Sequence, residues 1–219
     1  MQITDNVYYF PESGMMDCNT YVIRDDITVL IDPGLDHYLP MLTEALNKEG
    51  IDPESIDMIV NTHLHLDHYW ATESLKRLTD ARIMLHPLQK ESYNTTVIDV
   101  TKVFGMDPVH IHEDGLLDSN LNTGNLDFQI LSTPGHSPDS ITFYCEDKGI
   151  IICGDVVFAG NTGRVDFPGG SGKQLKESIN ALSKLNAEHL LPGHMGIVSG
   201  AEKVRQNFEF VRKNVFPWL

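Results

Sequence analysis

The sequence is poor in cysteine, and it begins without an apolar leader. Its 219 residues include three cysteines, Cys18, Cys145 and Cys153, an odd number without a C-x-x-C pair. A disulfide scaffold is therefore excluded, and a reducing, cytoplasmic location is expected. The first six residues show neither a basic region nor an apolar run, so we expect no secretory signal.

Positive charge is also scarce. Lys and Arg number 16 against 31 Asp and Glu, which gives a formal net charge of −15. A protein that grips nucleic acid needs Lys and Arg to displace the counterions of the phosphate backbone, so no nucleic-acid partner is expected. No apolar run approaches the ~18 residues of a membrane-spanning helix, so we expect no membrane association. Hydrophobic residues make up 41% of the chain, enough for a substantial core.

No linker, charge block or repeat divides the sequence, so residues 1–219 are interpreted as a single domain. Short apolar runs bounded by turn residues predict strands, and the runs 19–24 and 27–31 predict a hairpin. Apolar residues at helical spacing predict helices over about 39–48, 172–185 and 201–214. Because hairpins outnumber strand–helix–strand units, the pattern favours an α+β fold. We expect two mixed sheets packed face to face, with helices on the outer faces.

The strongest local signal is the segment 61–68, which holds three of the ten histidines. In an extended segment, residues i and i+2 point to the same side, so His63 and His65 can bind one metal. A tight turn after Leu66 would direct Asp67 and His68 at a second ion. Imidazole and carboxylate suit zinc, iron or manganese rather than calcium. The spacing differs from H-E-x-x-H on a helix, so a zincin is not expected.

Four other apolar runs also end in Asp or His beside Gly or Pro. The residues at these ends are Asp32, His136, Asp155 and His194. A strand supplies rigidity and the turn places a polar side chain at its rim, which suits a ligand site. Asp32 is predicted to be a buried carboxylate that orients a ligand imidazole, with a plain Asp-Pro-Gly turn as the alternative. Cys153 is predicted to be a buried neighbour of Asp155 rather than a ligand.

Taken in order, these residues resemble the metallo-β-lactamase superfamily, from Asn19 to His194. The H-x-H-x-D-H motif with a later His, Asp and His is highly specific for it. The resemblance implies an αββα sandwich with a dinuclear metal site at one edge. It implies that two divalent ions are bound, with zinc expected and iron or manganese as alternatives. By the same resemblance, the first metal would be held by His63, His65 and His136, the second by Asp67, His68 and His194, and Asp155 would bridge the two.

Positions that differ among family members indicate which of these members the sequence resembles most. Asp155 stands where zinc β-lactamases often carry Cys, and His65 stands where flavodiiron proteins usually carry Glu. The stretch G-R-V-D-F-P-G-G at 163–170 is similar to short glyoxalase II-type hydrolases, and persulfide dioxygenases carry a related element. Arg164 could pair with Asp166 and hold this loop, or offer its guanidinium to a substrate carboxylate. We favour the pairing.

Three residues depart from the usual pattern of the family. Trp70 stands near a position that usually has small residues. Its side chain could line the substrate pocket or pack against the helix that follows. Asp139 and Met195 stand where Gly is common. The helical C-terminal domain that binds glutathione in full-length glyoxalase II is absent or reduced to the helix expected over 201–214. The sequence therefore does not identify the thiol carrier of a thioester substrate.

The leading hypothesis is a metal-dependent hydrolase that cleaves a thioester, as glyoxalase II-like enzymes do, through a metal-bridging hydroxide. Two close cations can lower the pKa of a bridging water towards ~7. The catalytic residues would be Asp67 and Asp155, which are among the ligands. The two cations would leave the site slightly positive, so a small anionic substrate is expected. The oligomeric state is not indicated.

Two alternatives use the same residues. A persulfide dioxygenase-like oxidoreductase would bind iron through His63, His136 and Asp155, a two-His-one-carboxylate arrangement with open positions for dioxygen. A lactonase would use the full ligand set for ester hydrolysis. Metal content and stoichiometry would separate the oxidoreductase from the hydrolases.

Overall fold

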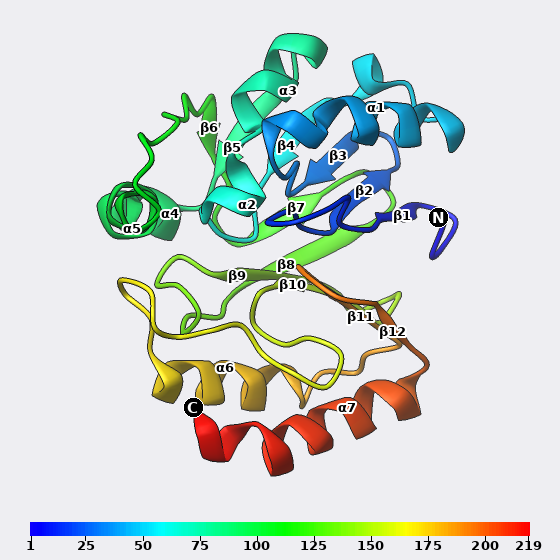
Figure 1. Cartoon of the computed structure of the whole chain (residues 1–219). Helices are drawn as coiled ribbons and strands as arrows, with labels where there is room; N and C mark the ends of the chain where they lie inside the picture. Colours follow the sequence, from blue (N-terminus) through cyan, green and yellow to red (C-terminus); the bar gives the residue numbers. More distant parts are fainter.

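The computed structural model describes residues 1–219 as two stacked six-stranded sheets with helices on both outer faces (Figure 1). The first sheet has the order β1-β2-β3-β4-β5-β6, and the second has the order β12-β11-β10-β9-β8-β7. Helices α1 and α3 cover the first sheet, and α6 and α7 cover the second (Figure 1). The predicted αββα sandwich is confirmed.

The first sheet is built by the N-terminal half of the chain. Its strands are β1 (Val7–Phe10), β2 (Thr20–Arg24), β3 (Thr28–Ile31), β4 (Met58–Val60), β5 (Arg82–Leu85) and β6 (Gly115–Leu116). Its helices are α1 (Leu39–Lys48), α2 (Leu66–Tyr69), α3 (Thr72–Thr79), α4 (Pro87–Glu91) and α5 (Val100–Val103), with a π-helical turn at Asn94–Asp99. Strands β1 to β3 pair antiparallel, and β3 to β6 pair parallel. The predicted hairpin is therefore β2–β3.

The second sheet is built by the C-terminal half. Its strands are β7 (Asn120–Asn122), β8 (Asp127–Ser132), β9 (Ile141–Cys145), β10 (Ile150–Gly154), β11 (His189–Pro192) and β12 (Val198–Ser199). Its helices are α6 (Gly172–Leu182) and α7 (Ala201–Asn214). Only β10 and β11 pair parallel. The longest helix, α7, has 14 residues, and none of the helices has both the length and the apolar character needed to cross a membrane.

The strands are buried on both faces, so the molecule has three apolar layers: one between the sheets, one beneath α1 and α3, and one beneath α6 and α7. In β2, Tyr21 and Ile23 belong to the core between the sheets, whereas Val22 belongs to the core beneath α1 and α3. In β10, Ile152 faces the other sheet and Ile151 faces α6 and α7. Alternate side chains of a strand point to opposite faces, so a continuous apolar run is required wherever both faces are covered.

The pairing of the strands places their ends at one edge of the sandwich. Because β3 and β4 are parallel neighbours, their carboxyl ends meet, and the same holds for β10 and β11. The backbone N–H of Ile141 donates to the carbonyl of Thr62, which joins the end of β4 to β9 in the other sheet. The loops that carry the predicted ligands therefore converge at this edge.

Candidate metal centre

Four loops bring the seven predicted ligands into one cluster. The loop after β4 carries His63, His65, Asp67 and His68, and the loops after β8, β10 and β11 carry His136, Asp155 and His194. Their ligand atoms form three groups, each within 4.8 Å: His63, His65 and His136; His63, His68 and Asp155; Asp67, His68 and His194. The expected tight turn after Leu66 is instead the one-turn helix α2, which carries Asp67 and His68 on consecutive positions.

Asp155 lies at the centre of this cluster. Its Oδ2 is 3.3 Å from His194 Nε2 and 3.5 Å from His136 Nε2, and its Oδ1 is 3.3 Å from His68 Nε2. Asp67 Oδ2 is also 3.3 Å from His194 Nε2. One carboxylate thus contacts imidazoles from both of the ligand sets that the sequence predicts.

Several ligand atoms are buried without a hydrogen-bond partner. These atoms are His63 Nε2, His65 Nε2, His68 Nε2 and Asp155 Oδ1; the last two lie 3.3 Å apart as an ion pair but do not meet the geometry of a hydrogen bond. An unpartnered buried polar group costs about 1–3 kcal/mol, and native proteins leave few of them unexplained. Nitrogen and carboxylate oxygen in this proportion suit zinc, iron or manganese. The residues present therefore fit a pair of divalent cations.

Burial and neighbouring charges set the protonation states of the predicted ligands. Burial lowers the pKa of His65 to about 3 and lowers the pKa of His136 below its usual range. Burial acts to raise the pKa of Asp155, but His194 and His68 beside it hold that pKa well below the ordinary value. Metals bind neutral imidazole and ionised carboxylate, so His65, His136 and Asp155 are in the binding form at neutral pH. By contrast, Asp155 raises the pKa of His194 to about 11 although burial acts to lower it, and nearby anionic groups, Asp155 and Asp32 among them, raise the pKa of His68 well above its ordinary value. These two imidazoles must each release a proton when a metal binds.

Asp32 contacts the predicted ligand His68 through the ring nitrogen Nδ1. This buried carboxylate places Oδ2 3.0 Å from His68 Nδ1 and accepts the Thr62 hydroxyl at 2.7 Å. Its Oδ1 accepts the backbone N–H of Thr62 at 2.7 Å, and Asp32 itself has φ +58°. A proton held on Nδ1 leaves the Nε2 lone pair of His68 free for a cation. Asp32 is thus buried and contacts His68, whereas its role in orienting a metal ligand stays a prediction.

Replacement of Asp32 by Asn tests that contact. Asn tolerates the left-handed backbone, but its neutral amide holds the imidazole proton less strongly. We expect metal affinity to fall about 10- to 100-fold. Competition with a chromophoric chelator measures the affinity, and Asp147→Asn in the exposed β9–β10 turn is the control. Equal affinity for both variants would contradict the orienting role.

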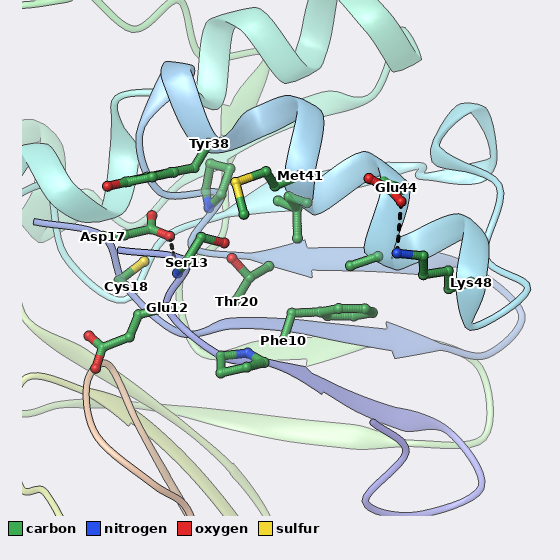
Figure 2. Close-up of a pocket in the computed structure, with 14 residues that line it drawn as sticks. Phe10, Glu12, Ser13, Asp17, Cys18, Thr20, Tyr38, Met41, Glu44 and Lys48 are labelled. Carbon is green, nitrogen blue, oxygen red and sulfur yellow. Dashed lines mark hydrogen bonds and ion pairs between the residues drawn. The ribbon is translucent and has the colours of Figure 1, made fainter. Parts of the chain in front are cut away.

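Glu12 is a further contact that the sequence does not indicate. Its Oε2 is 3.1 Å from His194 Nδ1, although 182 residues separate the two. Glu12 also lies at the edge of a cavity of about 330 Å³ between the start of β2 and α1, where Figure 2 shows it near Cys18. No motif surrounds Glu12, so only the tertiary structure reveals that it can orient His194.

The loop 163–170 contacts the cluster through its backbone. The Arg164 carbonyl accepts a hydrogen bond from His136 Nδ1 at 2.7 Å. The Arg164 guanidinium pairs with Asp166 through two hydrogen bonds, of 2.6 and 2.5 Å, and lies 4.1 Å from the ring centre of Phe167. Both members of this ion pair are exposed, so the pair adds at most about 1 kcal/mol of stability. The pair links two residues within the loop, and the contact with His136 is made by the backbone of Arg164.

Two other residues singled out in the sequence also lie near the site. Trp70 is half-buried, packs against the core beneath α1 and α3, and lines a further cavity. Cys153 is buried, and its Sγ lies 3.4 Å from the carbonyl oxygen of Val157. Burial raises the pKa of the Cys153 thiol to about 12, so it is protonated at neutral pH.

Asp139 is a buried carboxylate in the loop after His136. Its Oδ2 accepts the backbone N–H of Leu64 at 3.0 Å, and its Oδ1 has no hydrogen-bond partner. Leu64 lies between His63 and His65, so Asp139 ties the two ligand loops together. Burial raises the pKa of Asp139 to about 6.

Asp139 gives the metal-free protein a predictable pH dependence. Its pKa is higher in the folded than in the unfolded protein, so stability falls as pH rises from about 4 through about 6. The penalty at neutral pH is up to about 3 kcal/mol. An amide oxygen in place of the carboxylate would still accept from Leu64, so Asp139→Asn should stabilise the metal-free protein by about 1–3 kcal/mol at pH 7. That gain should vanish near pH 4.

Urea unfolding at several pH values measures this difference. Asp147→Asn is the control, because an exposed carboxylate carries no burial penalty. A stability difference between Asp139→Asn and the original chain that stays constant from pH 4 to pH 7 would show that the carboxylate is not the cause.

The cluster opens into a cavity of about 390 Å³. Its lining combines five of the predicted ligands with apolar side chains, which are Met16, Leu66, Val100, Phe104, Phe158 and Phe167. Phe167 packs edge-on against His65, with ring centres 5.6 Å apart. Arg164 is the only Lys or Arg in the lining, and it is already paired with Asp166.

Comparison with known proteins gives consistent matches. The family model of the metallo-beta-lactamase superfamily matches residues 14–194. The "Probable metallo-hydrolase YqgX" of Bacillus subtilis is 31% identical over 187 residues, covering 83% of this chain and 86% of the relative. The crystal structure of the BLEG-1 B3 metallo-beta-lactamase has a TM-score of 0.77 at 26% identity, covering 93% of this chain and 96% of that one. TTHA1623 in a di-iron-bound form has a TM-score of 0.74 at 28% identity, covering 96% and 100%.

Proposed function

The chain belongs to the metallo-beta-lactamase superfamily as a metallo-hydrolase, and on that premise we propose that it cleaves a thioester with two bound divalent metal ions. The observation that carries this proposal is the set of buried, unpartnered ligand atoms around Asp155, open to a cavity of about 390 Å³. Zinc is the proposed metal. Iron stays an alternative because the similar protein TTHA1623 was solved with two irons.

Two features support a thioester rather than a β-lactam. Asp155 occupies the position where zinc β-lactamases often carry Cys, and the loop 163–170 is similar to that of short glyoxalase II-type hydrolases. This loop lies directly on the site, since the Arg164 carbonyl contacts His136 and Phe167 packs on His65. The apolar cavity wall also suits the weakly hydrated sulfur of a thioester.

The chain's own residues prepare the site for hydrolysis. We assign His63, His65 and His136 to one metal, Asp67, His68 and His194 to the other, and Asp155 to both. Two bound cations would lower the pKa of a water between them towards ~7 and polarise the thioester carbonyl. The contacts of Asp32 and Glu12 hold the Nδ1 protons of two ligand imidazoles and so fix their orientation.

Asp67 is the proposed proton acceptor. Its carboxylate lines the cavity, and its hydrogen bond with His194 lowers a pKa that burial would raise. It is therefore ionised at neutral pH and can take the proton of the attacking water on a carboxylate oxygen. The predicted substrate is a small molecule that carries negative charge, because two dications outweigh Asp67 and Asp155.

Metal analysis combined with thioester cleavage tests this function. We expect two zinc ions per chain and hydrolysis of an acyl thioester that follows metal occupancy. His194→Ala should lose the second metal and most activity, whereas the control His110→Ala, at an exposed position, should lose neither. Full activity of His194→Ala with one metal would refute the dinuclear mechanism.

The same preparation separates the alternatives. One iron per chain with oxygen uptake on a persulfide would favour the dioxygenase-like reaction through His63, His136 and Asp155. Two metals with lactone but no thioester cleavage would favour a lactonase. Either result would replace the proposed thioester activity.

A further inference from the structure

A second cavity adjoins the catalytic one. It measures about 330 Å³ and is lined by Met16, Leu35, Asp36, His37, Leu66, Trp70 and Met106. Met16 and Leu66 line both cavities, so the two spaces meet at these side chains. None of the predicted metal ligands lines the second cavity. It therefore extends the site away from the metals.

The side chains around this junction are apolar and unusually exposed. Met16, Met106 and Phe104 are each about two-fifths exposed, at 42%, 41% and 40%. They come from two separate segments, one before β2 and one after α5. Exposed apolar side chains gathered over one site indicate a surface that an apolar ligand covers. Single exposed residues would carry no such meaning.

Met16 has a backbone conformation that is rare for its type. Its φ is +59°, in the left-handed region that methionine seldom adopts. This conformation is held at the junction of the two cavities, where strain often accompanies function. The methionine side chain is unbranched and has three rotatable bonds, so it can move aside and pack along an incoming chain.

The second cavity has no unpaired Lys or Arg that would bind an anionic group, so the charged part of the substrate belongs at the metals. In the cavity of about 390 Å³ at the cluster, Arg164 is paired with Asp166. In the second cavity, the charged or titratable side chains are Asp36 and His37. The floor is formed by buried Leu35 and Leu66 with half-buried Trp70. Binding of an apolar chain in such a groove is favourable, because each methylene that leaves water lowers the free energy.

Building on the proposed thioester hydrolysis, we propose that the substrate is a medium- or long-chain acyl thioester. Its carbonyl lies at the metals, and its acyl chain passes over Met16 and Leu66 into the second cavity, against Trp70 and Met106. The two cavities together thus set the acyl-chain specificity of the site. The short polar acyl group of a glyoxalase II substrate would leave the second cavity empty.

Binding to metal-free protein gives a test that does not depend on turnover. The chain has two tryptophans, and the Trp218→Phe variant leaves Trp70 as the only one. Ketone analogues, in which a methylene replaces the thioester sulfur, are titrated with acetyl, hexanoyl and decanoyl chains. We expect a saturable change in Trp70 emission for the decanoyl analogue, with a Kd at least about tenfold lower than for hexanoyl. Equal Kd values for all chains, or an unchanged emission, would overturn the proposal.

Kinetics on metal-loaded protein give the second test. The value of kcat/KM should rise about threefold per methylene from acetyl to decanoyl thioesters. Met106→Glu places a charge in the groove and should flatten this rise. Met41→Glu makes the same change at a similarly exposed methionine outside both cavities, and it should leave the rise intact. If kcat/KM of the Met106→Glu variant still rose with acyl-chain length, the acyl chain would not bind in the second cavity.

These tests separate the two proposals. Hydrolysis of all thioesters at equal rates would refute the groove and support thioester hydrolysis. Chain-length-dependent emission without thioester cleavage would refute the hydrolysis and support the groove. A dimer that Met106→Glu dissociates, with the chain-length dependence unchanged, would assign the exposed patch to a second copy of the chain and overturn the groove.

Discussion

Replacing Asp155 by Asn should reduce thioester hydrolysis at least ~100-fold, more than the loss of a residue that only supports a ligand. The carboxylate contacts His68, His136 and His194 at 3.3–3.5 Å and so links both ligand sets. An amide has nearly the same shape but lacks the negative charge that two dications require. The variant should therefore fold and bind its metals weakly.

Metal content after dialysis and kcat/KM with a decanoyl thioester measure this effect. Asp67→Asn is an informative comparison, because Asp67 belongs only to the second ligand set. It should retain one metal, whereas Asp155→Asn should lose affinity for both. Two tightly bound metals in Asp155→Asn would rule out a bridging position for this carboxylate.

Substitution of Gly193 by Ala should also lower activity about 100-fold or more, since a ligand displacement near 1 Å is enough to do so. A Cβ at this position would overlap Asp155 Oδ1 and lie 2.7 Å from His68 Cε1. The backbone of Gly193 is not left-handed, so alanine is allowed by its φ and the conflict comes from the ligands. The added methyl group displaces two ligands at once and should cost about 1–3 kcal/mol of stability through overpacking.

Gly196→Ala is the matched control for this substitution. It lies three residues further along the same loop, and a Cβ there would meet no atom within 4 Å. We expect its stability to change by less than about 0.5 kcal/mol and its activity to be unchanged. If Gly193→Ala bound metal as well as Gly196→Ala, the crowded packing around Asp155 would not govern the site.

Much of the candidate site could be predicted because its signals are local. The spacing of His63, His65 and His68 depends only on neighbouring residues, and so does the position of Asp155 after an apolar strand. The parallel pairing of β3 with β4 and of β10 with β11 then brings the strand ends together. The fold class followed similarly from apolar runs, which reveal strands that are buried on both faces.

Elements with little apolar periodicity could not be predicted in this way. Strands β6 and β12 have two residues each, too few for any alternation to be recognised. Helix α2 also lacks a periodic signal, since it consists of one turn that carries two ligands. Its turn is closed by backbone hydrogen bonds, from the N–H groups of His68 and Tyr69 to the carbonyl of His65, which the pattern of side chains does not report.

The sequence by itself determined which side chains are candidates for binding metal, and the tertiary structure decided how these side chains are oriented and which cavities they adjoin. The contact of Glu12 with His194 and that of Asp139 with Leu64 join distant segments. The junction of Met16 with Leu66 is likewise formed only when two loops pack together. Residue spacing reports which side chains share a strand or a turn, because the backbone geometry there is fixed. It cannot report contacts that depend on how two sheets stack, and these contacts orient the predicted ligands and shape the proposed acyl groove.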